Sequence, residues 1–451
     1  GMMGTISGSG VANVLTIGQF TIPLMTRFGY SRTFAGAVVA TSSMGGQIMP
    51  PVMGAVAFIM AETLDVPYAE VVKAAIIPAA LYYFTAFWMV HLEAGRLKLL
   101  GMPKDQCPNP WRALKEQWYL ALPLAALVFM LFNGFTPMFS GMMGLALTAI
   151  LILGAALAAR MSATALRYVF WFALGLGAAS FVKWGIVPVI ALIGVLVVGC
   201  FFVKGGSKTL HTMRSGLIDG AKQALGVGIA CAIVGVIIGV LTLTGAATNF
   251  AGFILEIGEM SLFLSLFLTM VVCLILGMGI PTIPNYIITS SIAAPALLKL
   301  GVPLMVSHMF VFYFGIMADL TPPVALAAFA AASIAKESAM KIGFKATQIA
   351  VAGFVVPYMA VYAPALMLQG DAGWLAVVYI VFKAVLAIFL WGAAAIGYLW
   401  APLSVAERIL ATAAAGSLVV AMPMTDEVGF ACAVVFVAWH FLRKKQQLVP
   451  A

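Results

Sequence analysis

The chain begins GMMGTISGSGVANVLTIGQFTIPLMTRFGY, residues 1–30, and this stretch carries no charged side chain before Arg27. It is apolar enough for a membrane helix, yet Gly-Ser-Gly at residues 8–10 interrupts it, and Asn13 follows. Glycine and small hydroxyl residues at this density weaken a helix. We therefore predict a re-entrant hairpin, which enters and leaves the membrane on one side and has its tip at this break.

The composition places most of the chain in lipid. Hydrophobic residues make up 63% of the 451 residues, charged residues make up 9%, and the mean hydropathy is +1.10. A soluble domain of this length could not cover so much apolar surface with so few charges. The five cysteines are scattered, without the spacing of a disulfide framework or a zinc site. The predicted fold class is an all-α polytopic membrane protein.

The distribution of charge predicts the topology. If the interrupted segments at 1–27 and 262–299 each return to their own side, 20 of the 24 Lys and Arg residues fall on one side of the membrane. Basic residues collect in cytoplasmic loops, so that side is the inner one and the C-terminus is predicted to be cytoplasmic. Twelve runs are predicted to cross the ~30 Å of hydrocarbon, at 32–61, 69–92, 118–134, 138–158, 165–182, 184–203, 224–245, 304–333, 346–368, 374–398, 409–424 and 428–442. Residues 204–222 are predicted to form an interfacial helix.

An internal repeat accounts for the interrupted segments. Asparagine, proline, glycine and a Pro-Pro pair recur at an offset of 272 residues, without a gap over 43 positions. The topology places the two copies in opposite orientations, and inverted repeats with interrupted helices are typical of secondary transporters. The aligned pairs are Asn13 with Asn285, Pro23 with Pro295, Gly29 with Gly301, and Pro50-Pro51 with Pro322-Pro323.

Such breaks free backbone groups that need partners inside a membrane. Freed carbonyls attract cations such as Na⁺, and freed N–H groups at helix N-termini attract carboxylates. Pairing each hairpin tip with the Pro-Pro break of its own repeat predicts two oxygen-rich clusters. The first contains Ser7, Gly8, Ser9 and Asn13 with Gly45, Gly46 and Gln47, and the second contains Gly277, Gly279, Thr282 and Asn285 with Asp319, Thr321 and Pro322.

The donor types in the two clusters suit a hard cation. Neither cluster contains a thiol or a histidine, so we predict Na⁺ rather than a transition metal. Asp319 lies within a predicted span, where acids are costly and usually functional. An alternative reading stays open, in which the glycines permit close helix packing and the hydroxyls bond backbone carbonyls. The residues predicted to contact a substrate anion are Ser9, Asn13, Thr282 and Asn285.

These same residues carry a resemblance to a known family. GTISGSGVANVLTIGQFTIPLMTRFGY (4–30) and GGQIMPPVMGA (45–55) resemble the first conserved block of the large membrane subunit of tripartite ATP-independent periplasmic (TRAP) transporters. LILGMGIPT (274–282) and FVFYFGIMADLTPPVALAAFAAA (310–332) resemble the second block. The amino-acid sequence of these blocks is most similar to that of fused permeases of the TAXI type, in which small and large membrane subunits form one chain. By this comparison the chain is expected to be N-terminally incomplete, lacking the ascending arm of the first hairpin.

The resemblance implies Na⁺-coupled symport of an organic anion, usually a carboxylate, which a periplasmic substrate-binding protein delivers. It implies a small membrane subunit, or its fused N-terminal equivalent, as a second partner. It also implies an elevator-type fold in the cytoplasmic (inner) membrane of a bacterium or archaeon. By motif, the Na⁺ sites of the family fall on Ser7, Gly8, Ser9, Asn13, Gly46 and Gln47, and on Gly277, Gly279, Thr282, Asp319, Thr321 and Pro322.

The expected organisation follows from the repeat and the resemblance together. Residues 1–61 and 246–335 would form the transport domain, of which the first part is incomplete. Residues 62–245 would supply scaffold and connecting helices, and residues 336–451 would be C-terminal transmembrane helices.

Other functions are less well supported by the sequence. HExxH, GxSxG and Walker motifs are absent, so no catalytic residues are predicted and the chain is not expected to be an enzyme. An intramembrane serine hydrolase built on residues 7–10 would lack a suitably placed histidine base. A channel and a binding-protein-independent anion symporter remain as alternatives. The nearest of these to the main hypothesis is the symporter, which would share the inverted hairpins.

Overall fold

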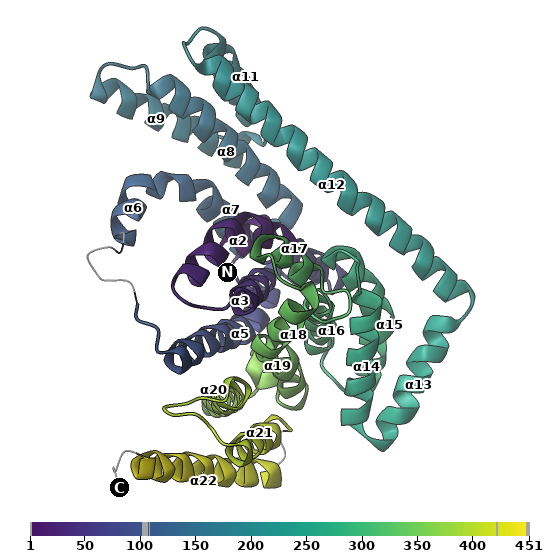
Figure 1. The fold of residues 1–451 in the computed structure, drawn as a ribbon. Helices are drawn as coiled ribbons and strands as arrows, with labels where there is room; N and C mark the ends of the chain where they lie inside the picture. Colours follow the sequence, from purple (N-terminus) through teal and green to yellow (C-terminus); the bar gives the residue numbers. More distant parts are fainter. Residues whose placement is uncertain (1, 102–106, 108, 421–422, 448–451) are drawn as a thin grey trace. The chain divides into compact units, whose positions relative to one another are not determined.

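The computed structural model describes residues 2–101, 107, 109–420 and 423–447, and the regular elements in these ranges are all helical (Figure 1). The prediction of an all-α polytopic membrane protein is confirmed. By length and composition, six of the described helices could cross a membrane, or seven if one bent pair counts as a span. The remaining predicted crossings correspond to shorter or broken helices. The six are Tyr68–Leu97, Pro110–Phe132, Pro137–Ala158, Gly206–Leu243, Trp374–Ile396 and Met424–Lys444.

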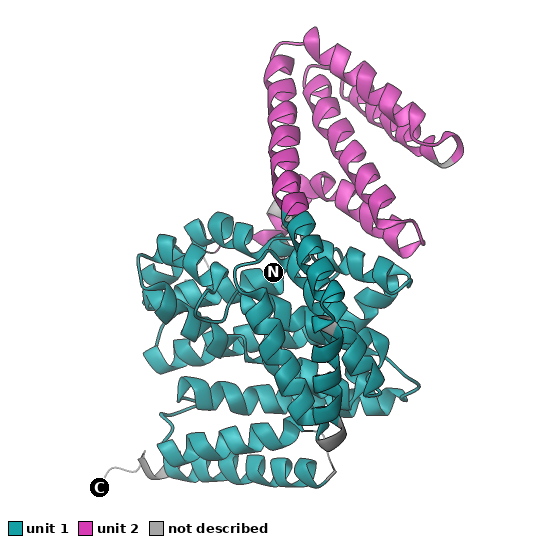
Figure 2. Ribbon diagram, turned by 90° about the vertical axis from the view of Figure 1, so that its right-hand side faces the viewer, with its two compact units in different colours: residues 1–102, 230–451 teal, residues 103–229 magenta. Residues whose placement is uncertain are grey.

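The chain divides into two compact units, which Figure 2 shows in different colours. One unit comprises residues 1–102 and 230–451, and the other comprises residues 103–229. The smaller unit contains α6 (Pro110–Gln117), the 3₁₀ helix η2 (Trp118–Ala121), α7 (Leu122–Phe132), α8 (Pro137–Ala158), α9 (Thr164–Ala179), α10 (Phe181–Trp184) and α11 (Val187–Phe201).

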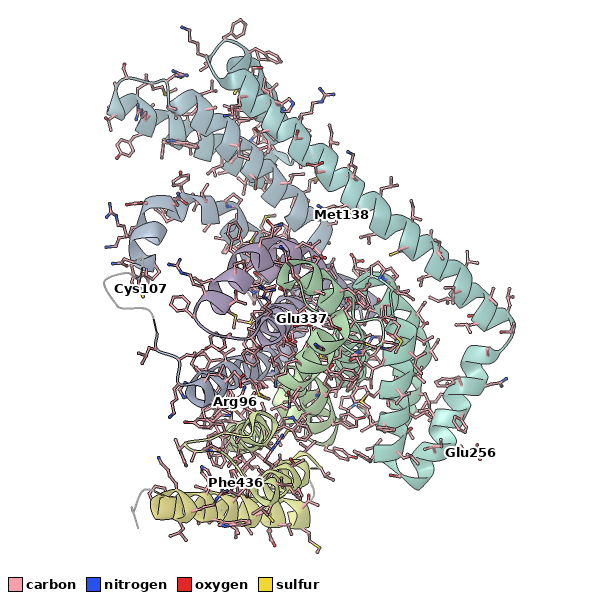
Figure 3. The ribbon with its side chains drawn as sticks, in the orientation of Figure 1. Arg96, Cys107, Met138, Glu256, Glu337 and Phe436 are labelled. Carbon is pink, nitrogen blue, oxygen red and sulfur yellow. The ribbon has the colours of Figure 1, made fainter. Side chains whose placement is uncertain are left out.

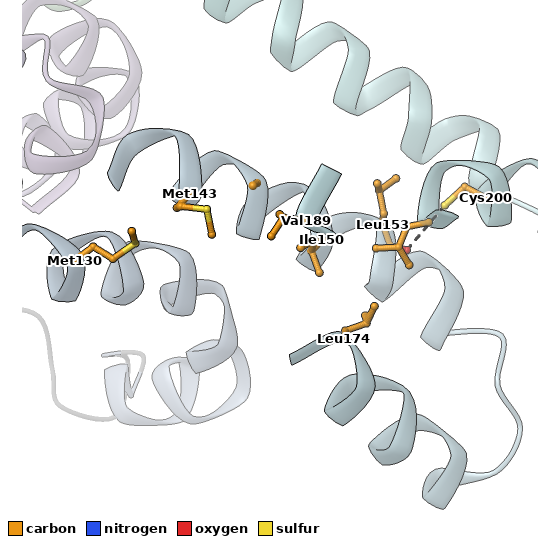
Figure 4. Packing of buried hydrophobic residues seen from close by; sticks show 9 residues of the cluster. Met130, Met143, Ile150, Leu153, Leu174, Val189 and Cys200 are labelled. Carbon is orange, nitrogen blue, oxygen red and sulfur yellow. Dashed lines mark hydrogen bonds between the residues drawn. The ribbon is translucent and has the colours of Figure 1, made fainter. Parts of the chain in front are cut away.

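The core of the smaller unit forms around α8 (Figure 4). Leu153 of α8 is fully buried and packs in one cluster with Leu174 of α9 and Cys200 of α11. The Cys200 thiol lies 3.9 Å from the backbone carbonyl of Leu153, within reach of a weak S–H···O contact. Cys200 therefore serves as a small buried apolar residue, as free cysteines commonly do.

Helix α12 (Gly206–Leu243) is continuous over 38 residues. At 1.5 Å per residue it is about 57 Å long, well beyond the ~30 Å of hydrocarbon. The separate interfacial helix predicted at 204–222 does not form. The basic and the apolar parts of this segment join in one helix because no proline interrupts them, and its glycines alone do not break it.

The larger unit holds both copies of the repeat. Its elements are α1 (Met2–Ser7), α2 (Gly10–Arg27), α3 (Arg32–Gly45), α4 (Ala55–Thr63), α5 (Tyr68–Leu97), α13 (Ala246–Met260), α14 (Leu262–Gly277), α15 (Thr282–Lys299), α16 (Leu304–Ala318), α17 (Leu326–Ala335), α18 (Ala339–Ile349), α19 (Val351–Tyr362), the 3₁₀ helix η3 (Pro364–Met367), α20 (Trp374–Ile396), α21 (Val405–Val419) and α22 (Pro423–Gln447).

The backbone repeats at the offset that the sequence predicts. Helices α2 and α15 each have 18 residues, and their first residues lie 272 positions apart. The first residues of α3 and α16 also lie 272 positions apart. Both Pro-Pro bonds are cis, and each is followed two residues later by a positive φ, at Met53 (59°) and Ala325 (36°). The two hairpins and the two broken helices are therefore copies of one unit.

The two copies interlock. Helix α17 of the second copy packs against α2 and α3 of the first (Figure 1). Helix α4 of the first copy contacts α15 of the second. The packing of α17 on α2 is close, because a Cβ added at Gly18 would lie 3.1 Å from Cδ1 of Ile334. Each hairpin thus supports the far half of the other copy's broken helix.

The predicted crossing at 346–368 is not one straight helix. Helices α18 and α19 meet at an angle of 40° around Ala350, and η3 follows at Pro364. The Thr347 hydroxyl lies 3.4 Å from the carbonyl of Leu320, in the second helix break. This tertiary contact near the bend involves a residue 27 positions away, so helix periodicity alone did not predict the bend.

The C-terminal helices α20, α21 and α22 pack against one another, with Phe436 of α22 fully buried (Figure 3). Lys383 in α20 is 1% exposed, and its Nζ lies 2.8 Å from Oδ1 of Asp426 in α22. Tyr379 donates a second hydrogen bond to Asp426, at 2.8 Å. Lys383 is therefore part of an ion pair within the C-terminal helices.

Lys383→Met is expected to lower the free energy of unfolding by about 3 kcal/mol, because a mostly buried Asp426 loses its counterion. Denaturant titration of the purified protein in detergent would measure the change. Lys341→Met is the matched control, since Lys341 pairs with Glu337 at 3.4 Å on an exposed surface, and its expected cost is below about 1 kcal/mol. Equal costs for the two variants would contradict a stabilising role for the buried pair.

Candidate functional site

The tip of the first hairpin meets the first helix break. Gly8 lies in the turn between α1 and α2 with φ +65°, and a Cβ added there would lie 3.7 Å from the backbone nitrogen of Ala55. A Cβ added at Gly10 would lie 2.9 Å from Nε2 of Gln47, and one at Gly46 would lie 2.5 Å from Cα of Gly4. The glycines let the hairpin approach the break at backbone distance.

The second hairpin repeats this arrangement. Gly279 lies at the tip with φ +76°, and a Cβ there would lie 3.5 Å from the side chain of Val324 at the second break. A Cβ added at Gly277 would lie 2.5 Å from Nδ2 of Asn285. That amide group donates a 2.9 Å hydrogen bond to the carbonyl of Gly315 in α16. Asn285 therefore fastens the second hairpin to the helix that breaks beside it.

Gln47 and Asp319 occupy equivalent positions in the two copies, 272 residues apart. The carbonyl of Gln47 accepts a 2.8 Å bond from the N–H of Gly54, and the carbonyl of Asp319 accepts a 3.0 Å bond from the N–H of Ala327. Each bond closes the loop that carries the Pro-Pro pair. The two side chains are 2% and 3% exposed. The 272-residue offset of the repeat is the sequence signal that pairs Gln47 with Asp319.

Three buried oxygens at the two breaks lack a hydrogen-bond partner within the described part of the chain. They are Oε1 of Gln47, Oδ1 of Asn285 and Oδ1 of Asp319. Leaving a buried acceptor unsatisfied costs about 1–3 kcal/mol, and such atoms call for an explanation. All three are acceptors, so a bound cation would satisfy them.

Several predicted site residues have other contacts. The Ser9 hydroxyl accepts a 3.3 Å bond from the N–H of Ala12 and caps α2, on an exposed side chain. The Thr321 hydroxyl donates to the carbonyl of Met317 at 2.7 Å. Gly45 faces the ring of Tyr82, and Pro322 packs against Gly343. None of these contacts tests ion binding, so the roles of Ser9, Thr321 and Pro322 stay predictions.

The other predicted residues lie close to the breaks. Asn13 is 2% exposed, and its amide lies beside Gly4, which in turn contacts Gly46. Thr282 is half-buried at the first position of α15. The side chain of Ser7 falls outside the described residues. The structure thus brings together Gly8, Asn13, Gly46 and Gln47 around the first break, and Gly277, Gly279, Asn285 and Asp319 around the second.

Helix α5 supplies tyrosines that the sequence analysis missed. Tyr82 and Tyr83 donate to the carbonyls of Thr41 and Ser42, at 3.0 and 2.9 Å, near the end of α3. Tyr68 donates to the carbonyls of Pro51, at 3.0 Å, and of Val52. Part of the backbone around the first break is therefore satisfied by side chains. No local pattern around these tyrosines indicates that role, because their partners lie 16 to 41 residues earlier in the chain.

The donor set limits the kind of metal that could bind. Within the described ranges, no group of three or more His, Cys, Asp or Glu side chains could hold a metal ion. Asp319 is the acid at the two breaks that sequence and structure both single out, and the remaining candidates are amide and backbone oxygens. Such a set fits a hard cation of low charge better than a transition metal.

Two interlocked copies of a hairpin and a broken helix define the chain as a membrane protein of the secondary-transporter kind. A family model described as "Tripartite ATP-independent periplasmic transporter, DctM component" matches residues 1–170 and 155–375. These matches include both hairpins and both breaks, and the chain belongs to this family, the large membrane component of TRAP transporters. No curated protein sequence matches the chain.

Membership in this family has direct consequences. The family is a transporter component rather than an enzyme. It works with a periplasmic binding protein and a small membrane subunit. Together with the apolar helices, it places the chain in the inner membrane as a multi-pass protein.

Proposed function

We propose that the chain is the permease of a Na⁺-coupled importer of an organic anion, a carboxylate that a periplasmic substrate-binding protein delivers. The observation that carries the proposal is the set of buried oxygens without a partner at Gln47, Asn285 and Asp319. Gln47 and Asp319 lie at the two helix breaks, and Asn285 lies in the first turn of α15 beside the second break. A cation at each break would satisfy them, and an ion gradient would then drive transport.

The Na⁺ sites would use the residues that converge on each break. Gly8, Asn13, Gly46 and Gln47 would line the first site, with Ser7 and Ser9 at the adjacent tip. Gly277, Gly279 and Asp319 would line the second, with Thr282, Thr321 and Pro322 nearby. Repeat symmetry supports two sites rather than one, and Asp319 in place of Gln47 would give the second site the stronger attraction for a cation.

The substrate carboxylate would lie near the N-termini of α2 and α15. N–H groups at a helix N-terminus favour an anion, and both helices begin directly after a hairpin tip. Ser9, Asn13, Thr282 and Asn285 would contact it through hydroxyl and amide N–H groups, which donate to a carboxylate. Na⁺ at the neighbouring breaks would offset the charge of the anion.

Alternating access would follow the elevator scheme. Residues 1–61 and 246–335 would move as the transport domain, while 62–245 contribute scaffold and connecting helices and 336–451 form C-terminal membrane helices. The interlocked packing of α17 on α2 and of α4 on α15 supports movement of the two copies as one body. The small membrane subunit, separate or fused in a TAXI-type chain, would complete the scaffold, with the C-terminus in the cytoplasm.

Uptake into proteoliposomes would test this function. The permease with its small membrane subunit is reconstituted, and radiolabelled carboxylates are added with the binding protein. Uptake should require both an inward Na⁺ gradient and the binding protein. Na⁺-driven uptake without the binding protein would favour the alternative of a binding-protein-independent anion symporter, and flux down the substrate gradient without Na⁺ would favour a channel.

A further inference from the structure

An apolar groove lies between helices α18 to α21, and Thr347 in its lining also contacts Leu320 at the second helix break. Its volume is about 920 Å³, at the upper end of the range for small-molecule sites. Phe344, Val355, Trp391 and Ile409 are among the residues that line it. Phe344 and Ile409 are exposed, so the groove opens onto the surface of the larger unit. In a membrane protein, such an opening faces acyl chains or another membrane-embedded chain.

Arg408, near the start of α21, is the charged residue that lines the groove. Its Nε donates a 2.7 Å hydrogen bond to the carbonyl of Ala394, which fixes the guanidinium beside the groove. The rest of the group has no described partner and is exposed. Gln348, which also lines the groove, is held by a 2.8 Å bond from its Nε2 to the carbonyl of Ala395. The groove therefore has a preformed cationic end.

The charges near this end favour an anion. Arg408 and Arg96 both lie close enough to Lys345 to influence its charge, and Glu93 is the acid in the same group. Glu93 pairs with Arg96 at 2.6 Å. Three cations and one acid leave a local charge of +2. A zwitterionic headgroup would bring its own amine against this excess, whereas a purely anionic headgroup would not.

The groove runs along α21 from Val405 to Ala413. Over these eight steps the helix rises about 12 Å at 1.5 Å per residue. That is less than half of the ~30 Å hydrocarbon core, so the groove fits within one leaflet. Arg408 lies on the predicted inner side, so a chain anchored there would extend toward the midplane.

We propose that this groove binds one anionic phospholipid of the inner leaflet, with its phosphate on Arg408 and an acyl chain along α21. The basic end, the apolar length and the single-leaflet span together match an amphiphile rather than a protein surface. None of the residues proposed to bind Na⁺ or the substrate lines the groove, so the lipid site does not rest on the proposed transport mechanism.

Native mass spectrometry of the full permease would test the proposal. The protein is reconstituted in nanodiscs of phosphatidylcholine and phosphatidylglycerol in equal parts and is then transferred to detergent, and the retained lipids are counted. The wild type should retain phosphatidylglycerol in preference to phosphatidylcholine. Arg408→Gln should reduce the retained phosphatidylglycerol about fivefold, the effect of one lost cation near a membrane surface. Ala413→Trp, which fills the exposed groove without touching the charge, should abolish retention of this lipid.

Two control variants test whether a loss of lipid is specific to the groove, rather than a general effect of removing a cation or adding a bulky side chain. Arg32→Gln removes an exposed cation elsewhere in the same unit, and Ala406→Trp adds the same bulk to α21 outside the groove. Both should retain lipid as the wild type does. Equal retention in all variants, or no preference for phosphatidylglycerol, would overturn the proposal. It would also be overturned if Ala413→Trp released the small membrane subunit while lipid retention stayed the same, because the groove would then be a protein interface.

Discussion

Asp319→Asn in the assembled transporter is expected to raise the external Na⁺ concentration for half-maximal uptake at least tenfold. The substitution keeps the size and one side-chain oxygen, so it removes only the charge. Asp319 is 3% exposed, and its Oδ1 has no partner among the described residues. At an effective dielectric constant of about 20, a contact between Na⁺ and a carboxylate is worth several kcal/mol. Losing only 1.4 kcal/mol of that attraction changes affinity tenfold.

The measurement is substrate uptake into proteoliposomes at a series of external Na⁺ concentrations. Asp371→Asn is the matched control, because Asp371 is exposed and lies outside both copies of the repeat. It should leave the Na⁺ dependence unchanged. A half-saturating concentration for Asp319→Asn within twofold of the wild type would remove Asp319 from the ion site. The unsatisfied oxygen would then need another explanation, such as a bound water.

The repeat was predictable because its markers are local. Proline and glycine act on the backbone at their own positions, so the Pro-Pro pairs and the glycines near each tip located the breaks before any tertiary contact was known. The helices α2 and α15 begin where the sequence placed the two hairpin tips. The pairing of each tip with the break of its own copy also followed, since it rests on the same symmetry.

The partners that hold the breaks were not predictable in the same way. Tyr68, Tyr82 and Tyr83 sit in an ordinary apolar helix pattern, and only the fold brings their hydroxyls to the backbone around the first break. The 40° bend near Ala350 has no proline or glycine at its position and accompanies a contact with the second break. Short-range patterns indicate where a membrane helix stops. They do not indicate which distant side chain forms hydrogen bonds with the backbone groups around the helix break.

Gly277→Ala is expected to reduce Na⁺-driven uptake more than tenfold. The added Cβ would lie 2.5 Å from Nδ2 of Asn285 and 2.7 Å from Cβ of Ala318, both closer than packed atoms allow. Either the Asn285 amide leaves the carbonyl of Gly315, or the hairpin moves away from α16. Both outcomes displace an oxygen that we assign to the ion site. Overpacking of this kind also costs about 1–3 kcal/mol of stability, which thermal unfolding in detergent would measure alongside uptake.

Gly252→Ala is the control for this variant, because a Cβ added at Gly252 of α13 meets nothing within 4 Å. It should transport as the wild type does and be slightly more stable, since alanine favours a helix by about 1 kcal/mol over glycine. Gly46→Ala makes the symmetric test at the first break, where the new Cβ would lie 2.5 Å from Cα of Gly4. The clash there is with backbone, which cannot rotate away, so uptake should fall at least as far as in Gly277→Ala. Wild-type uptake in both variants would mean that the tips need not touch the breaks, and the two-site arrangement would fail.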